Sequence, residues 1–489
     1  MPRSSFFALL PLIALAACTV GPDYRRPASP AATAGWVEPA DTGAIDPRWW
    51  QQFNDPILTD LIDRALAGSP DSAEAEARLR EARANRDAAA GGAFPTLTAT
   101  GSATENRLSE NGQIPIGAIP GFSRDLSLFD LGFDASWEID LWGRNRRKVE
   151  GASARVEAAE ASRRDAMVML SAEIARNYLD LRAAQQDIEN LQDMANTDAE
   201  LTRLTRLRFD AGEASRLDAD TASSAARSSA AAVPDARANA AAAAYRIAAL
   251  VGAPPEEVAA RLLANRQPQP RSPDNILVGI RSDLLTRRPD VRRAEYDLAA
   301  ATADIGVAKA DLFPRFSLFG SIGQQARNAG DLTDAGSTRF QIGPSFSWPI
   351  FAAGTIRAQI RASNARADAA AARYEKAVFG ALSDSEAAIN RFLNASAAQT
   401  DAEAALAAQD SALRLAIQRA ERGEDDRLAL LRARKAYMAM DRAALNARRA
   451  KGQAGVALFK ALGGGWSEQG EHGPSASPTA SLAPGQPRR

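Results

Sequence analysis

Residues 129–141 read FDLGFDASWEIDL, and apolar and polar side chains alternate through this stretch without a break. Successive side chains of a β-strand point to opposite faces, so the pattern predicts a strand with one apolar and one polar face. The stretch 340–350 repeats the alternation in the second half of the chain, and weaker alternation precedes each of the two. The sequence therefore predicts two β-hairpins, at about 94–141 and 313–351, with strands of roughly ten residues.

The two faces of these hairpins differ in polarity. A half-buried sheet in a soluble domain is one interpretation, but it would need a covering layer, and the rest of the chain reads as long helices without a spare apolar face. Strands of this length cross a bilayer when tilted, and aromatic residues cluster near their ends, which favours a membrane barrel. The apolar face, which we expect to contact lipid, carries Phe129, Leu131, Phe133, Trp137, Phe340, Ile342, Phe346 and Trp348. The other face carries an acidic row made of Asp130, Asp134, Glu138 and Asp140.

An open sheet of four strands cannot close a barrel, and unpaired strand edges are not tolerated in lipid. The protein must therefore oligomerise to span a membrane. Two copies supply eight strands, whose interior is filled by side chains, whereas three supply twelve and leave room for a lumen. A homotrimer follows if the interior is a passage, and the acidic row would then line the lumen and favour cations.

The chain is an internal duplication. Between its first two repeated glycines each copy runs about 65 residues without a proline, which predicts one helix of roughly 100 Å. A second helix returns after the glycine, so each copy ends in an antiparallel helical hairpin. Upstream the repeat separation is 219 residues, as between Pro70-Asp71 and Pro289-Asp290. Downstream three pairs of glycines stand 211 residues apart, namely Gly143 and Gly354, Gly212 and Gly423 at the hairpin tips, and Gly252 and Gly463.

Apolar residues in these helices recur at heptad spacing. The spacing predicts coiled-coil-like packing of neighbouring helices, and the alanine at most other positions allows their close approach. Taken alone, such a hairpin would be interpreted as a plain structural coiled coil, so the functional interpretation depends on the strands. The heptad residues are Ile174, Leu181 and Ile188 in the first copy and Leu431, Met438 and Leu445 in the second.

The N-terminus has the pattern of a bacterial lipoprotein signal peptide. Arg3 precedes an apolar run, and LAAC at 15–18 fits a lipobox. The run is too short to span a bilayer as a helix, so residues 1–17 are predicted to be cleaved. Cys18 is the only cysteine of the chain and is expected to carry lipid as the first mature residue. Thr19 follows it rather than aspartate, which permits delivery to the outer membrane.

Composition excludes several classes of function. The net charge is −1 and the pI about 6.2, so no basic surface indicates nucleic acid. His472, the only histidine, lies in a tail, 464–489, that we predict to be disordered. The chain has no GxxxxGKS/T, GxSxG or HExxH motif, and one histidine with one cysteine cannot supply the usual nucleophile and metal constellations. We therefore expect neither an enzyme nor a cofactor or metal site.

Several longer stretches together resemble one family. They are LAACTVGPDYRRP (15–27), WWQQFNDPILTDLIDRAL (49–66), SWEIDLWGRNRR (136–147), RFDAGEASRLD (208–218), RSDLLTRRPDVRRAE (281–295), IGVAKADLFPRFSLFG (305–320), IGPSFSWPIFAAG (342–354) and ALGGGW (461–466). With them the chain resembles the TolC-like outer-membrane efflux proteins, in the NodT-type lipoprotein branch, over essentially the whole mature chain. The resemblance implies an N-terminal equatorial segment 18–54, a first repeat 55–252, an equatorial linker 253–280 and a second repeat 281–463.

The resemblance implies an α+β membrane protein with a defined assembly. In this family three copies form a twelve-stranded β-barrel in the outer membrane, with four strands per protomer, continued by a long α-helical tunnel through the periplasm. The implied partners are a periplasmic membrane-fusion adaptor and an inner-membrane pump of the resistance-nodulation-division type. The implied function is passive export of small molecules, such as drugs and toxic compounds. The hairpin tips would dock the adaptor through Arg208, Gly212, Leu217, Gly423 and Leu428.

The implied periplasmic gate departs from the family pattern. Relatives close the entrance with acidic rings just inside the tip. Here Asp218 is acidic, but its counterpart in the second repeat is Ala429, and three residues further on the chain has Arg432. We hypothesise that Arg432 closes the entrance by pairing with Asp218, or with Asp425 or Asp426. The alternative is that Arg432 lies outside the pore.

Two other functions fit the same sequence pattern. One is an outer-membrane conduit for type I protein secretion, and the other is a non-conducting trimeric lipoprotein scaffold. The lining of the tunnel does not identify the cargo, because one architecture serves many functions.

Overall fold

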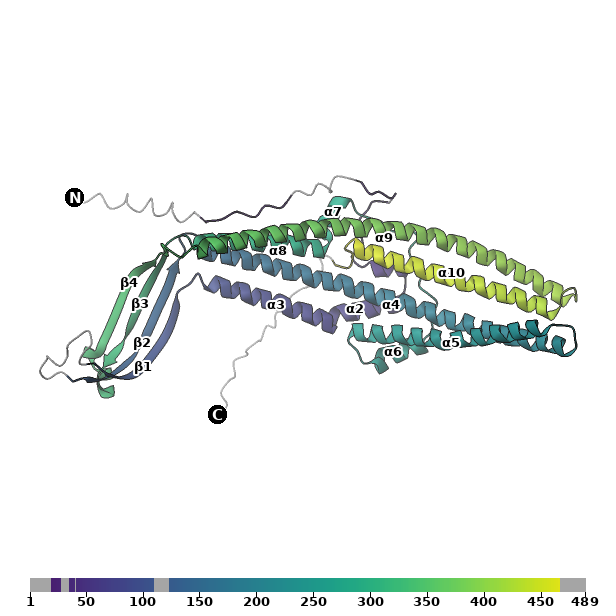
Figure 1. Ribbon diagram of the computed structural model, residues 1–489, viewed down its shortest axis with the longest axis horizontal. Helices are drawn as coiled ribbons and strands as arrows, with labels where there is room; N and C mark the ends of the chain where they lie inside the picture. The colour runs from purple at the N-terminus through teal and green to yellow at the C-terminus, as the bar shows by residue number, and fades with distance from the viewer. Residues whose placement is uncertain (1–18, 28–34, 40, 110–122, 467–489) are drawn as a thin grey trace, which may run out of the picture. The chain divides into compact units, whose positions relative to one another are not determined.

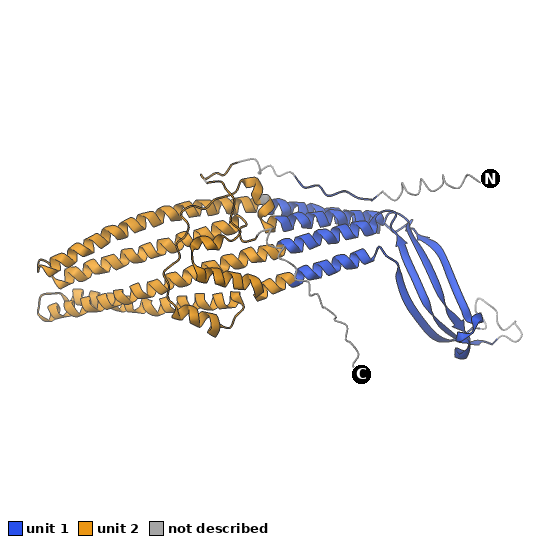
Figure 2. Cartoon of the chain, turned by 180° about the vertical axis from the view of Figure 1, so that it is seen from behind, with its two compact units in different colours: residues 1–28, 77–161, 292–377 blue, residues 29–76, 162–291, 378–489 orange. Residues whose placement is uncertain are grey.

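The computed structural model describes residues 19–27, 35–39, 41–109 and 123–466 (Figure 1). The predicted signal peptide, Cys18 and most of the predicted tail lie outside these residues. No helix in the described part of the chain is both long and apolar enough to cross a membrane. The chain divides into two compact units that each draw on both repeats (Figure 2). Unit 1 comprises residues 1–28, 77–161 and 292–377, and unit 2 comprises residues 29–76, 162–291 and 378–489.

Unit 1 contains a four-stranded antiparallel sheet. The two predicted hairpins are confirmed, and they join through pairing of the second strand with the third. Within the described residues the first and last strands pair on one side only, so both edges of the sheet are open. In chain and sheet order the strands are β1 (Thr96–Arg107), β2 (Asp125–Ile139), β3 (Arg315–Ala326) and β4 (Thr338–Ser347), with the short helices η4 (Ala329–Thr333) and η5 (Ala335–Ser337) between the last two.

The register places the predicted polar residues on one face of the sheet. Asp130 lies opposite Ser102 of β1 and Gln325 of β3, so hydroxyl, amide and carboxylate groups share that face. The other face holds the predicted apolar residues, and no layer of the single protomer covers most of them. Their exposed fractions are 62% for Leu131, 54% for Phe133, 77% for Phe340, 73% for Ile342 and 69% for Phe346.

Two tryptophans fasten the sheet to the preceding helices in the same way in both repeats. The indole N–H of Trp137 donates to the carbonyl of Ala93 at 2.9 Å, and that of Trp348 donates to the carbonyl of Leu312 at 3.0 Å. Each acceptor stands directly before the repeated Phe-Pro pair that leads into a strand. The rings are half in contact with protein and half exposed, which suits amphipathic indoles at the end of a membrane segment.

The predicted long helices and their return helices are confirmed. The shorter helices α3 (Pro70–Gly91) and α8 (Pro289–Ala310) each begin at the repeated proline and run 22 residues. The heptad residues of both repeats are buried, as predicted. The long helices are α4 (Arg144–Asp210) and α9 (Thr355–Glu421), of 67 residues each, and the return helices are α5 (Arg216–Val251) and α10 (Arg427–Ala461).

Further elements in unit 2 pack around the ends of these helices. Trp49 stacks on Phe459 of α10 with ring centroids 5.0 Å apart, and a bridge joins Thr42 to Val278. Arg182 of α4 is fully buried and donates at 2.7 Å to the carbonyl of Asn265, which ends a short helix. The additional elements are η2 (Trp49–Phe53), α2 (Pro56–Gly68), α6 (Pro255–Ala264) and α7 (Arg281–Arg287).

The repeated glycines mark turns through left-handed backbone. All six have φ between 71° and 81°, a region in which a β-carbon is disfavoured. Their surroundings differ, however. A β-carbon at Gly252, where α5 ends against the start of α3, would lie 2.6 Å from Cδ of Pro70. A β-carbon at Gly212, at the hairpin tip, would meet nothing within 4 Å.

Gly252→Ala should therefore destabilise the protein more than Gly212→Ala. Both variants place alanine in left-handed backbone, at a cost of about 1–2 kcal/mol, but only the methyl group at position 252 also meets a neighbouring ring. We expect the midpoint temperature of helix unfolding, followed by circular dichroism, to fall further for Gly252→Ala. Equal losses would show that the junction of α5 with α3 adjusts to the added methyl group without further cost.

Candidate functional site

In the predicted acidic row on the sheet, the carboxylate of Asp130 is bound by an arginine. Asp130 accepts two hydrogen bonds from Arg339 of β4, from Nη2 at 2.5 Å and from Nε at 2.8 Å, and a third from Gln325 at 2.8 Å. Asp134 accepts one from Thr100 of β1 at 2.8 Å. The negative charge of Asp130 is therefore balanced by a guanidinium group on the same face.

One member of the predicted row needs correction. β2 ends at Ile139, so Asp140 lies beyond the strand. Its carboxylate accepts a hydrogen bond at 2.9 Å from the backbone N–H of Arg146, in the first turn of α4. A carboxylate at this place stabilises a helix N-terminus, where N–H groups lack intrahelical partners. Asp140 thus has a structural role at the turn into α4, whereas Glu138 keeps its place in the strand, opposite Ser317.

The tips of the two helical hairpins present different surfaces although their backbones match. Gly212 and Gly423 both adopt positive φ, and both would leave an added β-carbon uncontacted within 4 Å. Leu217 of the first tip is 75% exposed, in keeping with its predicted docking role. Its counterpart Leu428 is only 6% exposed. The prediction for Leu428 is corrected, because its side chain packs inside the protomer and is not available to a partner.

The predicted gate carboxylates of the second tip already have partners. Asp426 caps α10 by accepting from the N–H of Ala429 at 2.7 Å, and it lies 3.7 Å from the guanidinium of Arg208 at the end of α4. Asp425 pairs with Arg419 at 2.9 Å. The contact of Arg208 with Asp426 joins the two hairpin tips, so a predicted docking residue and a predicted gate residue meet.

The carboxyl of Asp218 is bound by Ser215 and not by Arg432. It accepts hydrogen bonds from the hydroxyl and the backbone N–H of Ser215 at the start of α5, and these bonds, more than the positive charge of Arg432, hold its pKa below the usual value. Among the residues described, no ion pair joins Arg432 to Asp218, Asp425 or Asp426 within the protomer. The hypothesis that Arg432 closes the entrance stays a prediction about contacts between protomers.

A row of charged contacts between α4 and α10 was missed by the sequence analysis. The two helices lie side by side (Figure 1), with carboxylates on α4 and cations on α10. Asp198 and Lys435 are 2.6 Å apart, Asp187 and Arg442 2.7 Å, and Asp180 and Arg449 3.7 Å. We call these three pairs the α4–α10 seam. A signal existed, because Lys435, Arg442 and Arg449 are spaced by heptads.

The seam is most deeply buried at Asp198. This carboxylate is 2% exposed and also accepts a hydrogen bond from Ser229 of α5, so it links three helices. At the other end of the seam, burial raises the pKa of Asp180 above its usual value, although Arg449 and nearby arginines oppose the shift. The seam therefore holds the hairpin of the first repeat against the hairpin of the second.

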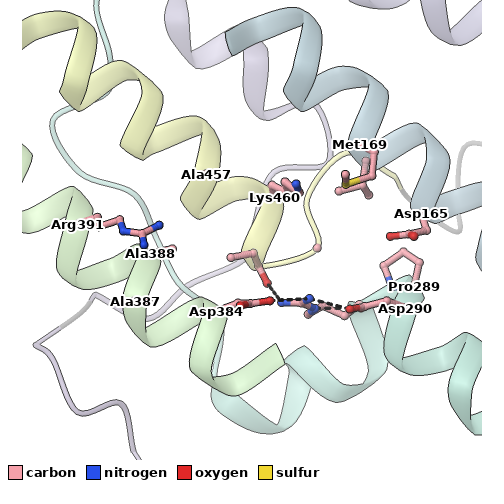
Figure 3. Close-up of a pocket in the computed structure, with 14 residues that line it drawn as sticks. Asp165, Met169, Pro289, Asp290, Asp384, Ala387, Ala388, Arg391, Ala457 and Lys460 are labelled. Atoms are coloured by element: carbon pink, nitrogen blue, oxygen red, sulfur yellow. Dashed lines mark hydrogen bonds and ion pairs between the residues drawn. The ribbon is translucent and has the colours of Figure 1, made fainter. Parts of the chain in front are cut away.

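A cavity of about 440 Å³ lies where α10 ends against the start of α8 (Figure 3). Arg288 lines the cavity and contacts Asp290 at 2.7 Å, Asp384 of α9 at 3.4 Å and the carbonyl of Ala461 at 3.1 Å. Burial by itself would raise the pKa of Asp290, but the Arg288 guanidinium and backbone N–H groups together hold that pKa below the usual value. The cavity marks a helix junction stabilised by Arg288.

Comparison with known proteins places these features in a family. The family model described as outer membrane efflux protein matches residues 61–253 and 280–464. The probable efflux pump outer membrane protein TtgC of Pseudomonas putida is 31% identical over 491 residues, covering 96% of this chain and 97% of that protein. Nodulation protein T of Rhizobium leguminosarum bv. trifolii is 32% identical over 392 residues, covering 78% of this chain and 80% of that protein.

Solved structures agree with the fold over nearly the whole chain. The outer-membrane channel OprN has a TM-score of 0.80 and 36% identity, and the alignment covers 92% of this chain and all of OprN. The MtrE outer membrane channel of Neisseria gonorrhoeae, in its open state, has a TM-score of 0.78 and 27% identity over 92% of this chain and 98% of MtrE. The expected resemblance is confirmed, and the chain belongs to the outer membrane efflux protein family.

Proposed function

We propose that this protein works as a homotrimeric outer-membrane channel, through which small molecules leave the periplasm passively. The observation that carries the proposal is the sheet of unit 1, which has an uncovered apolar face and two open edges. In lipid each open edge would leave backbone N–H and C=O groups unpaired, at several kcal/mol per group. Pairing β1 of one copy with β4 of the next satisfies both edges and closes a barrel of three sheets.

The same closure assigns each face of the sheet to a solvent. The apolar face turns outward to lipid, and the face with Asp130, Asp134 and Glu138 turns inward to water. The helices of unit 2 would continue the passage through the periplasm. A closed, polar path of this kind lets a solute cross without entering lipid, and it needs no catalytic group.

The proposed partners follow from the hairpin tips and from the family. A membrane-fusion adaptor would dock on the tips, where Leu217 offers an exposed apolar contact and Arg208 a charged one. An inner-membrane pump of the resistance-nodulation-division type would supply the energy. The names of the relatives, which refer to efflux pumps, support small-molecule cargo over the secretion of proteins.

A lipid anchor at Cys18 is also part of the proposal, and the residues that follow it support this. The backbone N–H of Val20 donates to the carbonyl of Trp142 at 3.0 Å, and Asp23 pairs with Arg147 of α4 at 2.7 Å. Thr19 lies so close to Gly143 that a β-carbon there would stand 2.2 Å from its methyl group. The segment next to Cys18 is therefore fixed at the turn from β2 into α4, close to the proposed membrane boundary.

The purified protein should be trimeric and should conduct ions. We expect native mass spectrometry in detergent to give three copies, because only a closed barrel satisfies the edges of β1 and β4. The same material should give discrete current steps in a planar bilayer. A trimer that gives no current would favour the non-conducting scaffold, and a stable monomer without detergent would contradict the membrane barrel itself.

Lipidation can be tested on the mature N-terminus. Mass spectrometry of protein isolated from outer membranes should find Cys18 as the first residue, with a mass increase equal to a diacylglyceryl group with or without an amide-linked acyl chain. Cys18→Ser should lack this increase. An unmodified mature chain that begins at another residue would remove the anchor from the proposal and leave the barrel and the tunnel in place.

Arg432→Ala tests the proposed gate. If Arg432 closes the entrance by pairing across protomers, the variant should show a larger single-channel conductance and should make cells more susceptible to large antibiotics. Arg432→Lys, which retains the charge, should stay close to the original protein. Asparagine variants of Asp218, Asp425 and Asp426 would identify the partner. Unchanged conductance and susceptibility for Arg432→Ala would place Arg432 outside the pore.

A further inference from the structure

Arg339 reaches across a whole strand to bind Asp130. Arg339 lies on β4 and Asp130 on β2, with β3 between them. The guanidinium binds both carboxylate oxygens, at 2.5 Å and 2.8 Å, and its third nitrogen lies 3.4 Å from the hydroxyl of Ser321 on β3. Gln325 of β3 donates to the same carboxylate. The pair is therefore held in one geometry by groups from three strands.

Glycine in the middle strand makes this crossing possible. The register places Arg339 opposite Gly323, and Gly323 opposite Gly132. A β-carbon at Gly323 would lie 2.6 Å from the carbonyl oxygen of Leu131, so no other residue fits there without a shift of the backbone. Because neither glycine has a side chain, no group stands between the guanidinium and the carboxylate on this face.

Such a pair contributes little to stability, but it changes the charge on the polar face. The side chains of Arg339 and Asp130 are 32% and 15% exposed, and ion pairs that contact water are weakened by solvent screening. In a passage with low-dielectric walls, by contrast, a charge repeated by symmetry changes the local concentration of ions of each sign. Rings of acidic residues select cations, and rings of arginine or lysine select anions.

We propose that Arg339 is a selectivity-determining residue of the passage, because it cancels the charge of Asp130 and leaves that level open to anionic as well as cationic solutes. The inference rests on the proposed function, since the polar face must line the lumen. It revises the expectation of a cation-favouring acidic row. Cation preference is left to Asp134 and Glu138, which have no arginine from β4 bound across the sheet among the described residues.

The test is the reversal potential of single channels under a gradient of KCl at about 0.1 M, where charges act over about 10 Å. Arg339→Gln leaves the carboxylate unbalanced, so the cation-to-anion permeability ratio should rise by about two- to five-fold. Asp130→Asn leaves the guanidinium unbalanced, so the ratio should fall by a similar factor. The double variant Asp130→Asn/Arg339→Gln should return to the original ratio, because it is neutral at this level.

Arg327→Gln is the matched control, because it removes a positive charge just beyond the end of β3 without touching the pair. It should shift the ratio less than Arg339→Gln does. If Arg339→Gln and Asp130→Asn both conduct with the original cation-to-anion permeability ratio, Arg339 does not set the selectivity of the channel. Equal shifts for Arg327→Gln and Arg339→Gln would also overturn the inference. If the unaltered protein gives no current, the proposed function fails instead, and native mass spectrometry of each variant separates lost assembly from lost selectivity.

Discussion

A backbone N–H or C=O group at the edge of a sheet has no partner in hydrocarbon, and this single constraint organises the molecule. The sheet of unit 1 has too few strands to close on itself, and the apolar side chains on one face are unfavourable in water. Assembly with other copies is then a condition of the fold in the membrane. The helices face no such constraint, because every helix satisfies most of its backbone groups internally. Two of them can therefore run for 67 residues without a partner segment for their backbone groups.

The two repeats share a small set of local structural features. Glycine in left-handed backbone recurs at the same three positions of each repeat, and the indoles of Trp137 and Trp348 donate to equivalent carbonyls. Where the repeats diverge, the geometry is retained and the chemistry differs. Leu217 is exposed and Leu428 is buried, at matching places of two tips. After a duplication the two repeats can keep the same backbone geometry while the surface side chains of one repeat change.

The sequence predicts features that depend on local periodicity or on one special residue. Alternation predicts the strands and their two faces, and the repeated glycines predict the ends of the helices. Both signals are local, because a strand has period two and a left-handed turn needs glycine. Cys18 is predicted on the same basis from its lipobox, although it lies outside the described residues.

Features that depend on register or on packing between distant segments escape such analysis. Arg339 contacts Asp130 only because the pairing of β2 with β3 and of β3 with β4 brings the two residues close together. The sequence around either residue does not predict this contact. The α4–α10 seam likewise requires knowing which long helices are neighbours. The two errors have local causes. Asp140 continues the alternation of polar and apolar residues but lies just past the end of β2. Leu428 occupies the position in the second repeat that matches the exposed Leu217, yet its own side chain is buried.

The charged contacts that hold the two hairpins together differ in burial, and burial ranks their contributions to stability. At the tip, Arg208 and Asp426 are about half exposed, so their contact is screened by water and contributes little. Deeper along the helices Asp198 is almost fully buried between three helices, so loss of Lys435 would leave a poorly solvated carboxylate and would cost more than loss of the contact at the tip. Of the charged contacts between the two hairpins of a protomer, the one at Asp198 is therefore the best shielded from water and the one at the tips the most screened.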